Sequence, residues 1–433
     1  MSVNKNKVLS GFFIIYFAIS IFDAYFIIYI PLYYLNIVNV NQTELSFIQS
    51  ITYLTLFVTP VLGLLYDKYI KKGSSSKAIL YFCCILLSLS FLIFILYKEI
   101  LLLYGIFVFI YFFSKSIIRT IMTGIFLKAV EESKSIKLNI ILLVNTATVV
   151  GYLGISLIFN FGVLTISSIG FWNSFFILGW VFSLPIILTS IIFSKRIEIV
   201  QNKKPFQSKK ISGEVQKSFR YEFIIIGIIY FSYILATSDL MVSYPLSSWI
   251  FNKFNEKGFR IYSSLYFMFF LCSILGLYIS NKLCKKYNEK KLMCMFIYMY
   301  MIFLFPITIS SFPMFMVFNS ILSVIAYSIA TTYTSLVTDF SNKGRYRTFK
   351  YQILQTSSSI SSLVFIPLGT LYFGVINVEN LIIISGILIG ISGIFVIITL
   401  PIDKRIRLMK EPILRNKTFF VEQDLQLVAE ESN

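Results

Sequence analysis

Histidine is missing from this sequence, and charged residues make up only 13% of its 433 residues. A soluble domain carries about 25% charged residues, so the composition excludes an ordinary soluble protein. Without histidine, a proton relay would have to use carboxylates, tyrosine, lysine or water. Sequence motifs for binding ATP phosphates, dinucleotides or zinc are also missing, and we therefore expect neither an enzyme nor an ATP-driven pump.

Cysteine is scarce, and its five positions show neither a metal-binding spacing nor a disulfide framework. They lie within apolar segments or beside a lysine-rich loop: Cys83, Cys84, Cys272, Cys284 and Cys294. We expect them to act as small packing residues. We also expect no metal and no bound cofactor.

Long apolar runs are abundant instead, because 57% of the residues are hydrophobic. A membrane-spanning helix needs about 20 apolar residues. Twelve segments qualify, namely 8–35, 44–66, 78–97, 100–127, 138–160, 171–194, 222–249, 260–281, 292–311, 313–337, 350–374 and 380–401. These runs lack the alternation of barrel strands, so the predicted fold class is an all-α membrane protein with twelve transmembrane helices.

Lysine and arginine lie almost entirely on one side of this predicted topology. Of the 38 basic residues, 32 fall in the termini and the connections on the N-terminal side, and four fall in the opposite connections. Cytoplasmic connections carry such an excess, so we expect both termini in the cytoplasm of a multi-pass cell-membrane protein. The net charge of +18 then faces anionic lipid headgroups rather than nucleic acid. We expect Trp172 and Trp249 to be interface anchors and most other aromatic residues to face lipid.

A short polar stretch occurs twice in the chain. The spacing Asp67-Lys68-x-x-Lys71-Lys72 returns as Asn281-Lys282-x-x-Lys285-Lys286, 214 residues later, and Pro31-Leu32 falls on Pro245-Leu246 at the same offset. Two landmarks at one offset indicate a duplicated unit. We predict two pseudo-symmetric six-helix bundles, 1–194 and 222–401, joined by a basic cytoplasmic linker, 195–221, and followed by a cytoplasmic tail, 402–433.

The topology, the basic linker and the first polar stretch resemble the major facilitator superfamily. Gly63, Asp67, Lys68, Lys71 and Lys72 match the signature of its first cytoplasmic loop, although Ile70 stands where the family has a second glycine. The second copy, with Asn281 and Lys282, is degenerate. The antiporter signature of helix 5 is not reproduced around Gly151 and Gly154, which disfavours a drug or proton antiporter.

The resemblance implies two halves that rock about a central site, with the signature residues and Asn281-Lys282 forming a cytoplasmic gate. Gly63 would let a neighbouring helix approach closely. Asp67 would pair with a cation or cap the N-terminus of a neighbouring helix. For Lys71 and Lys72, the plain positive charge of cytoplasmic loops is an alternative explanation.

Four charged residues lie deep within predicted helices: Asp23, Lys115, Arg119 and Asp239. A charge at the bilayer centre costs about 2.5–3.5 kcal/mol on insertion scales, so each is a functional candidate. Lys115 and Arg119 share a helix face, and with Asp23 they predict a cluster with one excess positive charge, which would attract an anionic or carboxylate-bearing solute. Asp239 has no evident cation partner and could carry a proton. The alternatives are a static Asp23–Lys115 pair and hydrogen bonds from Asp239 to hydroxyl groups such as those of Ser232 and Ser243.

Among the uncharged polar residues of the helices, Asn145, Tyr327 and Gln355 are the predicted solute contacts. The function we predict is secondary active transport of a small polar solute, coupled to protons, by a monomer. An uncoupled facilitator, a drug or solute exporter, and a receptor or scaffold that no longer transports remain alternatives. The intramembrane charges favour a transporter, because a scaffold has little reason to keep them.

Overall fold

The computed structural model describes residues 5–70, 74–129, 134–162, 170–182, 213–243, 245–246, 249–250, 258–309, 312–343, 346–373 and 375–402. Within these ranges the chain is helical apart from short turns. Among the described residues, ten helices are long and apolar enough to cross a membrane, which confirms an all-α membrane protein. The count of twelve spans and the orientation of the termini stay predictions.

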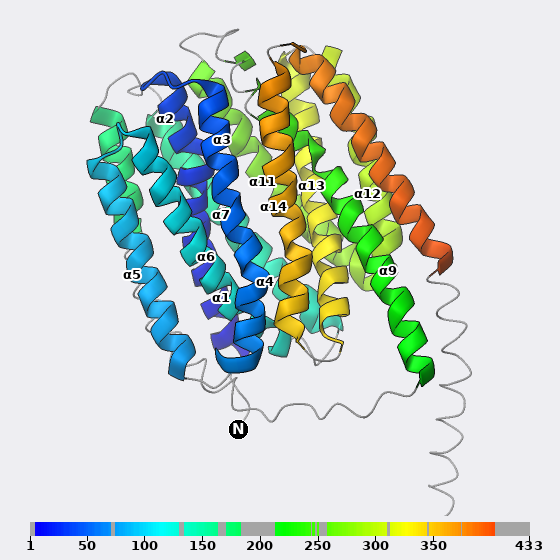
Figure 1. Ribbon diagram of the computed structural model, residues 1–433. Helices are drawn as coiled ribbons and strands as arrows, with labels where there is room; N and C mark the ends of the chain where they lie inside the picture. The colour runs from blue at the N-terminus through cyan, green and yellow to red at the C-terminus, as the bar shows by residue number, and fades with distance from the viewer. Residues whose placement is uncertain are drawn as a thin grey trace, which may run out of the picture.

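The first half forms a bundle of long, roughly parallel helices (Figure 1). Its elements are α1 (Lys5–Asp23), the π-helical turn η1 (Ala24–Tyr29), α2 (Ile30–Asn36), α3 (Gln42–Thr52), η2 (Tyr53–Phe57), α4 (Val58–Leu65), η3 (Tyr66–Ile70), α5 (Ser74–Leu96), α6 (Leu101–Ala129), α7 (Lys134–Gly162) and a shorter helix, Gly170–Phe182. The end of the bundle at which α1 begins is called the inner end below, and the opposite end the outer end.

The second half lies beside the first (Figure 1). Its elements are α9 (Gly213–Ala236), the 3-10 turn η6 (Ser238–Val242), α11 (Gly258–Lys286), α12 (Glu289–Leu304), η8 (Phe305–Ile309), α13 (Phe312–Ser341), α14 (Arg347–Phe373) and a last helix, Val378–Ile402. Residues 213–221, predicted as linker, are the first turns of α9. The rest of the predicted linker, 195–212, and the tail from 403 onward lie outside the described residues.

Aromatic side chains fill the interior of the first half, so the expectation that they mostly face lipid is wrong there. Tyr25 and Tyr29 are fully buried. Their hydroxyl groups donate to the Phe175 carbonyl at 3.0 Å and to Ser156 Oγ at 2.9 Å. Such bonds explain how tyrosine, with a polar tip, can occupy an apolar core.

Trp172 is likewise fully buried and does not anchor the bundle at the lipid interface as predicted. Its ring packs against Tyr33 and Phe159, with centroid distances of 5.4 and 5.7 Å. Trp172 does lie near a helix end, but its side chain faces the bundle, where it packs among buried aromatic rings.

Candidate functional site

Asp23 and Lys115 form a buried ion pair inside the first half. Lys115 Nζ lies 2.5 Å from Asp23 Oδ1, and the two residues are only 4% and 2% exposed. The Tyr111 hydroxyl donates to the same carboxylate oxygen, and the Lys115 ammonium lies 5.0 Å from the centroid of the Phe112 ring. The pair therefore joins α1 to α6, at the point where α1 passes into the π-helical η1.

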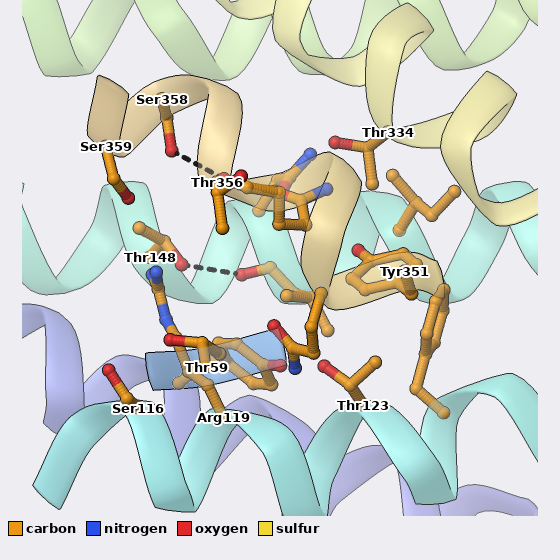
Figure 2. Close-up of a pocket in the computed structure, with 17 residues that line it drawn as sticks. Thr59, Ser116, Arg119, Thr123, Thr148, Thr334, Tyr351, Thr356, Ser358 and Ser359 are labelled. Atoms are coloured by element: carbon orange, nitrogen blue, oxygen red, sulfur yellow. Dashed lines mark hydrogen bonds between the residues drawn. The ribbon is translucent and has the colours of Figure 1, made fainter. Parts of the chain in front are cut away.

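Arg119 lies one turn further along α6 and does not join this pair. Within the described residues its guanidinium forms no ion pair and no hydrogen bond, and its buried Nε has no partner. It lines a cavity of about 200 Å³ between the two halves. Figure 2 shows Arg119 rising from its helix toward Thr148 of α7.

The cavity is lined by six of the described helices: α1, α4, α6 and α7 of the first half, and α13 and α14 of the second half. Most of the residues that line it have a polar group: Tyr16, Thr59, Ser116, Arg119, Thr123, Phe126, Ile141, Val144, Asn145, Thr148, Thr334, Tyr351, Gln352, Gln355, Thr356, Ser358 and Ser359. Most of these residues lie in the portions of their helices nearer the inner end. Among the described residues, Arg119 is the charged side chain in this wall, and no carboxylate lines it.

Three of the sequence-predicted residues thus meet at one cavity, namely Arg119, Asn145 and Gln355. Tyr327 does not line it and instead packs edge-on against Phe269 at 6.0 Å. Gln352, which belongs to the same polar stripe as Gln355 but was not among the predicted solute contacts, also lines the cavity and is 4% exposed. The glutamine-rich face of α14 was the signal that could have found it.

Asp239 lies away from the cavity, in the 3-10 turn η6 that interrupts the first transmembrane segment of the second half. Its carboxylate accepts a hydrogen bond of 2.7 Å from the Tyr300 hydroxyl. No ion pair of Asp239 occurs among the described residues. Ser232, predicted as its neighbour, donates instead to the Ser392 carbonyl at 2.8 Å.

Both intramembrane acids lie where a regular helix is interrupted. Asp23 ends α1 at a π-helical turn, and Asp239 lies in the 3-10 turn after α9. Departures from α-helical geometry within a helix often mark functional sites. The two acids are nonetheless unlike, because Asp23 contacts an ammonium group as well as a phenol, whereas Asp239 contacts a phenol and forms no ion pair among the described residues.

At the inner end, the first half caps a helix of the second half. Asp67 Oδ2 accepts a hydrogen bond of 3.1 Å from the backbone N–H of Phe349, in the first turn of α14. A β-carbon added at Gly63 would lie 3.0 Å from the Phe349 Cα, so the glycine allows this close approach. Just beyond, toward the cavity, Phe126 of α6 and Tyr351 of α14 meet with ring centroids 6.0 Å apart. Together these contacts close the space between α4, α6 and α14.

The other predicted gate residues form no hydrogen bond or ion pair between the halves within the described part of the chain. Lys68 and Lys282 are exposed, and Asn281 is buried with no hydrogen-bond partner for its side-chain oxygen among the described residues. Lys71 and Lys72 lie outside the described residues.

A second contact between the halves at the inner end was missed by the sequence analysis. The buried Lys137 of α7 lies 2.7 Å from Asp339 of α13 and 3.7 Å from Glu289 of α12. Lys134 also lies 3.1 Å from Glu289. These lysines had been assigned to the general positive charge of inner loops, and no sequence feature distinguishes them from the others.

On the outer side of the cavity, the halves also touch. The rings of Tyr152 on α7 and Phe270 on α11 stack at 4.8 Å. Nearer the outer end, the hydroxyl groups of Ser46 and Thr370 lie 2.9 Å apart, joining α3 to α14. The polar cavity therefore has contacts between the halves on both its inner and its outer side.

Comparison with known proteins points to one family. The family model of the Major Facilitator Superfamily matches residues 223–423, and no curated protein matches the chain.

Three similar solved structures are transporters. The human organic anion transporter MFSD10 (TETRAN) is 12% identical, covers 91% of this chain and 99% of its own, and has a TM-score of 0.66. A variant of the E. coli fucose:proton symporter FucP is 16% identical, with coverage of 92% and 99% and a TM-score of 0.59. A variant of the nucleoside transporter NupG is 12% identical, with coverage of 91% and 100% and a TM-score of 0.61. At these identities the likeness shows the fold.

Proposed function

Because the chain has the fold of Major Facilitator Superfamily transporters, which are not enzymes, and its second half matches that family's model, we propose that it is a secondary transporter. It moves a small polar solute across the cell membrane by alternating access, as a monomer with both termini in the cytoplasm. The observation that carries the proposal is the polar cavity between the halves, bounded by inter-half contacts on either side.

In this proposal the inner end is the cytoplasmic gate. Two latches hold it shut: the Asp67 cap on α14, and the ion pairs of Lys134 and Lys137 with Glu289 and Asp339, in which Lys137 contacts both acids. Each connects a helix of the first half to a helix of the second half. Rocking of the halves would break both latches together and would expose the cavity to the cytoplasm, where basic loops face anionic headgroups.

An anionic solute is favoured by the charges around the cavity. Asp23 forms its ion pair with Lys115, so the cluster of Asp23, Lys115 and Arg119 carries one excess positive charge, and no ion pair of the Arg119 guanidinium occurs among the described residues. A buried cation is stabilised by an anionic ligand far more than by a neutral one. The similarity in fold to a human organic anion transporter is compatible with this assignment.

Proton coupling through Asp239 is the second part of the proposal. Asp239 does not line the cavity, so it would act through the backbone of η6. That turn packs tightly on α14, since a β-carbon added at Gly369 would lie 1.8 Å from the Met241 carbonyl oxygen. The hydroxyl groups of Thr237 and Ser361 also lie 2.7 Å apart across the same contact. A change in the position of η6 on protonation of Asp239 would thus shift α14, the helix that carries Gln352 and Gln355.

The Asp239→Asn variant is expected to lose uptake driven by a pH gradient while keeping exchange of solute at equal pH. Asparagine retains the shape of the side chain but cannot release a proton. The measurement is uptake into proteoliposomes with and without an imposed gradient. Tyr300→Phe is the matched control, because it removes the hydrogen bond and leaves the acid.

If Asp239→Asn and Tyr300→Phe lose the same activity, the acid serves as a hydrogen-bond acceptor only. If gradient-driven uptake persists in Asp239→Asn, the protein couples transport to protons through another group. If the unmodified protein shows no gradient-driven uptake, it is an uncoupled facilitator. The place of Asp239 outside the cavity is the observation that favours the facilitator as the second candidate.

The transport proposal itself is tested by access to the cavity from each side. Thr123→Cys, in a background without the native cysteines, places a thiol in the cavity wall. We expect a membrane-impermeant maleimide to label it both in right-side-out and in inside-out vesicles. A receptor or scaffold with a fixed cavity would be labelled from one side only or from neither, and that result would contradict alternating access.

A further inference from the structure

The cavity presents unpartnered hydrogen-bond donors from both halves. Among the described residues, the buried Arg119 Nε, Gln352 Nε2 and Gln355 Nε2 have no partner in good hydrogen-bond geometry, although the Gln355 amide lies beside the Tyr351 hydroxyl. Buried polar groups in folded proteins nearly always have partners, and those that lack one require an explanation. All three atoms carry hydrogen to donate, so the missing partner is an acceptor.

These donors face the cavity from opposite sides of the interface between the halves. Arg119 belongs to α6 of the first half, and the two glutamines belong to α14 of the second half. Gln352 and Gln355 are three residues apart, which places them on neighbouring parts of one helix face. A single acceptor group between them would therefore be held by both halves at once.

The charge of the wall limits the charge of the ligand. One guanidinium and no carboxylate line the cavity among the described residues, and Lys115, one turn along α6 from Arg119, is paired with Asp23. A buried charge without compensation is strongly unfavourable. One negative charge balances this wall, whereas a dianion would bring a second charge that no described residue of the wall compensates.

The geometry of the donors selects the type of anion. A guanidinium presents parallel N–H groups that match the two oxygens of a carboxylate. A carboxylate has about four lone-pair sites, so it can accept from the arginine and from two amide groups together. The remaining wall offers the rings of Tyr16, Phe126 and Tyr351 to the rest of the molecule.

We propose that the cavity binds a monocarboxylate, whose carboxylate group bridges Arg119 of the first half and Gln352 and Gln355 of the second. This inference rests on the proposed transport function and adds the class of solute. Because the bridge joins the halves, binding favours the state in which they are closed around the solute.

The test measures binding to the purified full-length protein by calorimetry, with benzoate and acetate as probes. Benzamide and acetamide are their neutral analogues, and phenylphosphonate is the dianionic analogue of benzoate. We expect the carboxylates to bind at least about 10-fold more tightly than either class of analogue, as charge-assisted hydrogen bonds predict. Arg119→Gln and, separately, Gln355→Leu should each weaken benzoate binding by a similar factor, whereas Lys286→Gln, which removes an exposed cation, should not.

Equal affinity for benzoate and benzamide, tighter binding of phenylphosphonate, or no binding of either carboxylate at about 10 mM would overturn the inference. So would unchanged benzoate binding in a folded Gln355→Leu variant. The Thr123→Cys labelling separates this failure from failure of the transport proposal. Access from both sides without carboxylate binding would reject only the solute class, and carboxylate binding with access from one side would reject transport.

Discussion

Asp23→Asn is expected to lower the free energy of unfolding by about 3–5 kcal/mol, because it leaves a buried ammonium group without its counter-charge. Lys115 is 4% exposed and has no other anionic partner among the described residues. The measurement is thermal or chemical unfolding in detergent. A second change, Lys115→Met, should restore most of the lost stability, since it removes the stranded charge and keeps the volume of the side chain.

The matched control is Lys343→Gln, which breaks the Lys343–Glu222 pair. That lysine side chain is 50% exposed, and loss of such a pair costs at most about 1 kcal/mol. A double variant no more stable than Asp23→Asn alone would refute the account of the buried pair. The double variant also separates two roles, since a folded protein that still transports would show that the pair positions α1 against α6 and takes no part in coupling.

Releasing both inner latches, with Asp67→Ala and Lys137→Gln together, is expected to open the inner end. Loss of a helix N-cap costs about 0.5–2 kcal/mol, and loss of the ion pair between the buried Lys137 and Asp339, whose side chain is 52% exposed, adds about 1 kcal/mol or less. Each 1.4 kcal/mol changes the ratio of closed to open states about tenfold. Labelling of Thr123→Cys from the inner side should therefore become at least about 10-fold faster.

The matched control for the latches is Lys68→Gln, which removes an exposed cation next to Asp67 without touching α14. With this change, the Thr123→Cys thiol should be labelled at the same rate as in the protein with both latches intact. If the double variant is labelled at the same rate as this control, the contacts of Asp67 and Lys137 do not hold the inner end shut.

The pairing of Asp23 with Lys115 could be predicted from the sequence because few residues compete for it. Intramembrane charges are rare, and opposite charges in adjacent helices have strong reason to meet. The contrast between Arg119 and Lys115 could not be predicted. The two share a helix face, and only the positions of α1 and α7 around α6 decide that one faces an acid and the other the cavity.

The hydrogen bond between Tyr300 and Asp239 and the contacts of Lys137 could not be predicted from the sequence for a different reason. Each depends on the rotation of a helix about its own axis, which apolar segments hardly constrain because most of their residues suit either lipid or protein. The aromatic interior of the first half was missed for the same reason. Phenylalanine and tyrosine satisfy both environments, and the hydrogen bonds that bury Tyr25 and Tyr29 involve residues more than 100 positions away.

The central claim is that the two halves rock about the cavity, and paired distance measurements test it most directly. Spin labels at exposed positions report each end: Tyr69→Cys with Tyr287→Cys at the inner end, and Leu102→Cys with Val375→Cys at the outer end. We predict that the Asp67→Ala/Lys137→Gln change lengthens the distance between the inner spin labels, measured by double electron–electron resonance, while the distance between the outer labels stays the same or shortens. An unchanged inner distance, or both distances lengthening together, would contradict the rocking of two halves about this site.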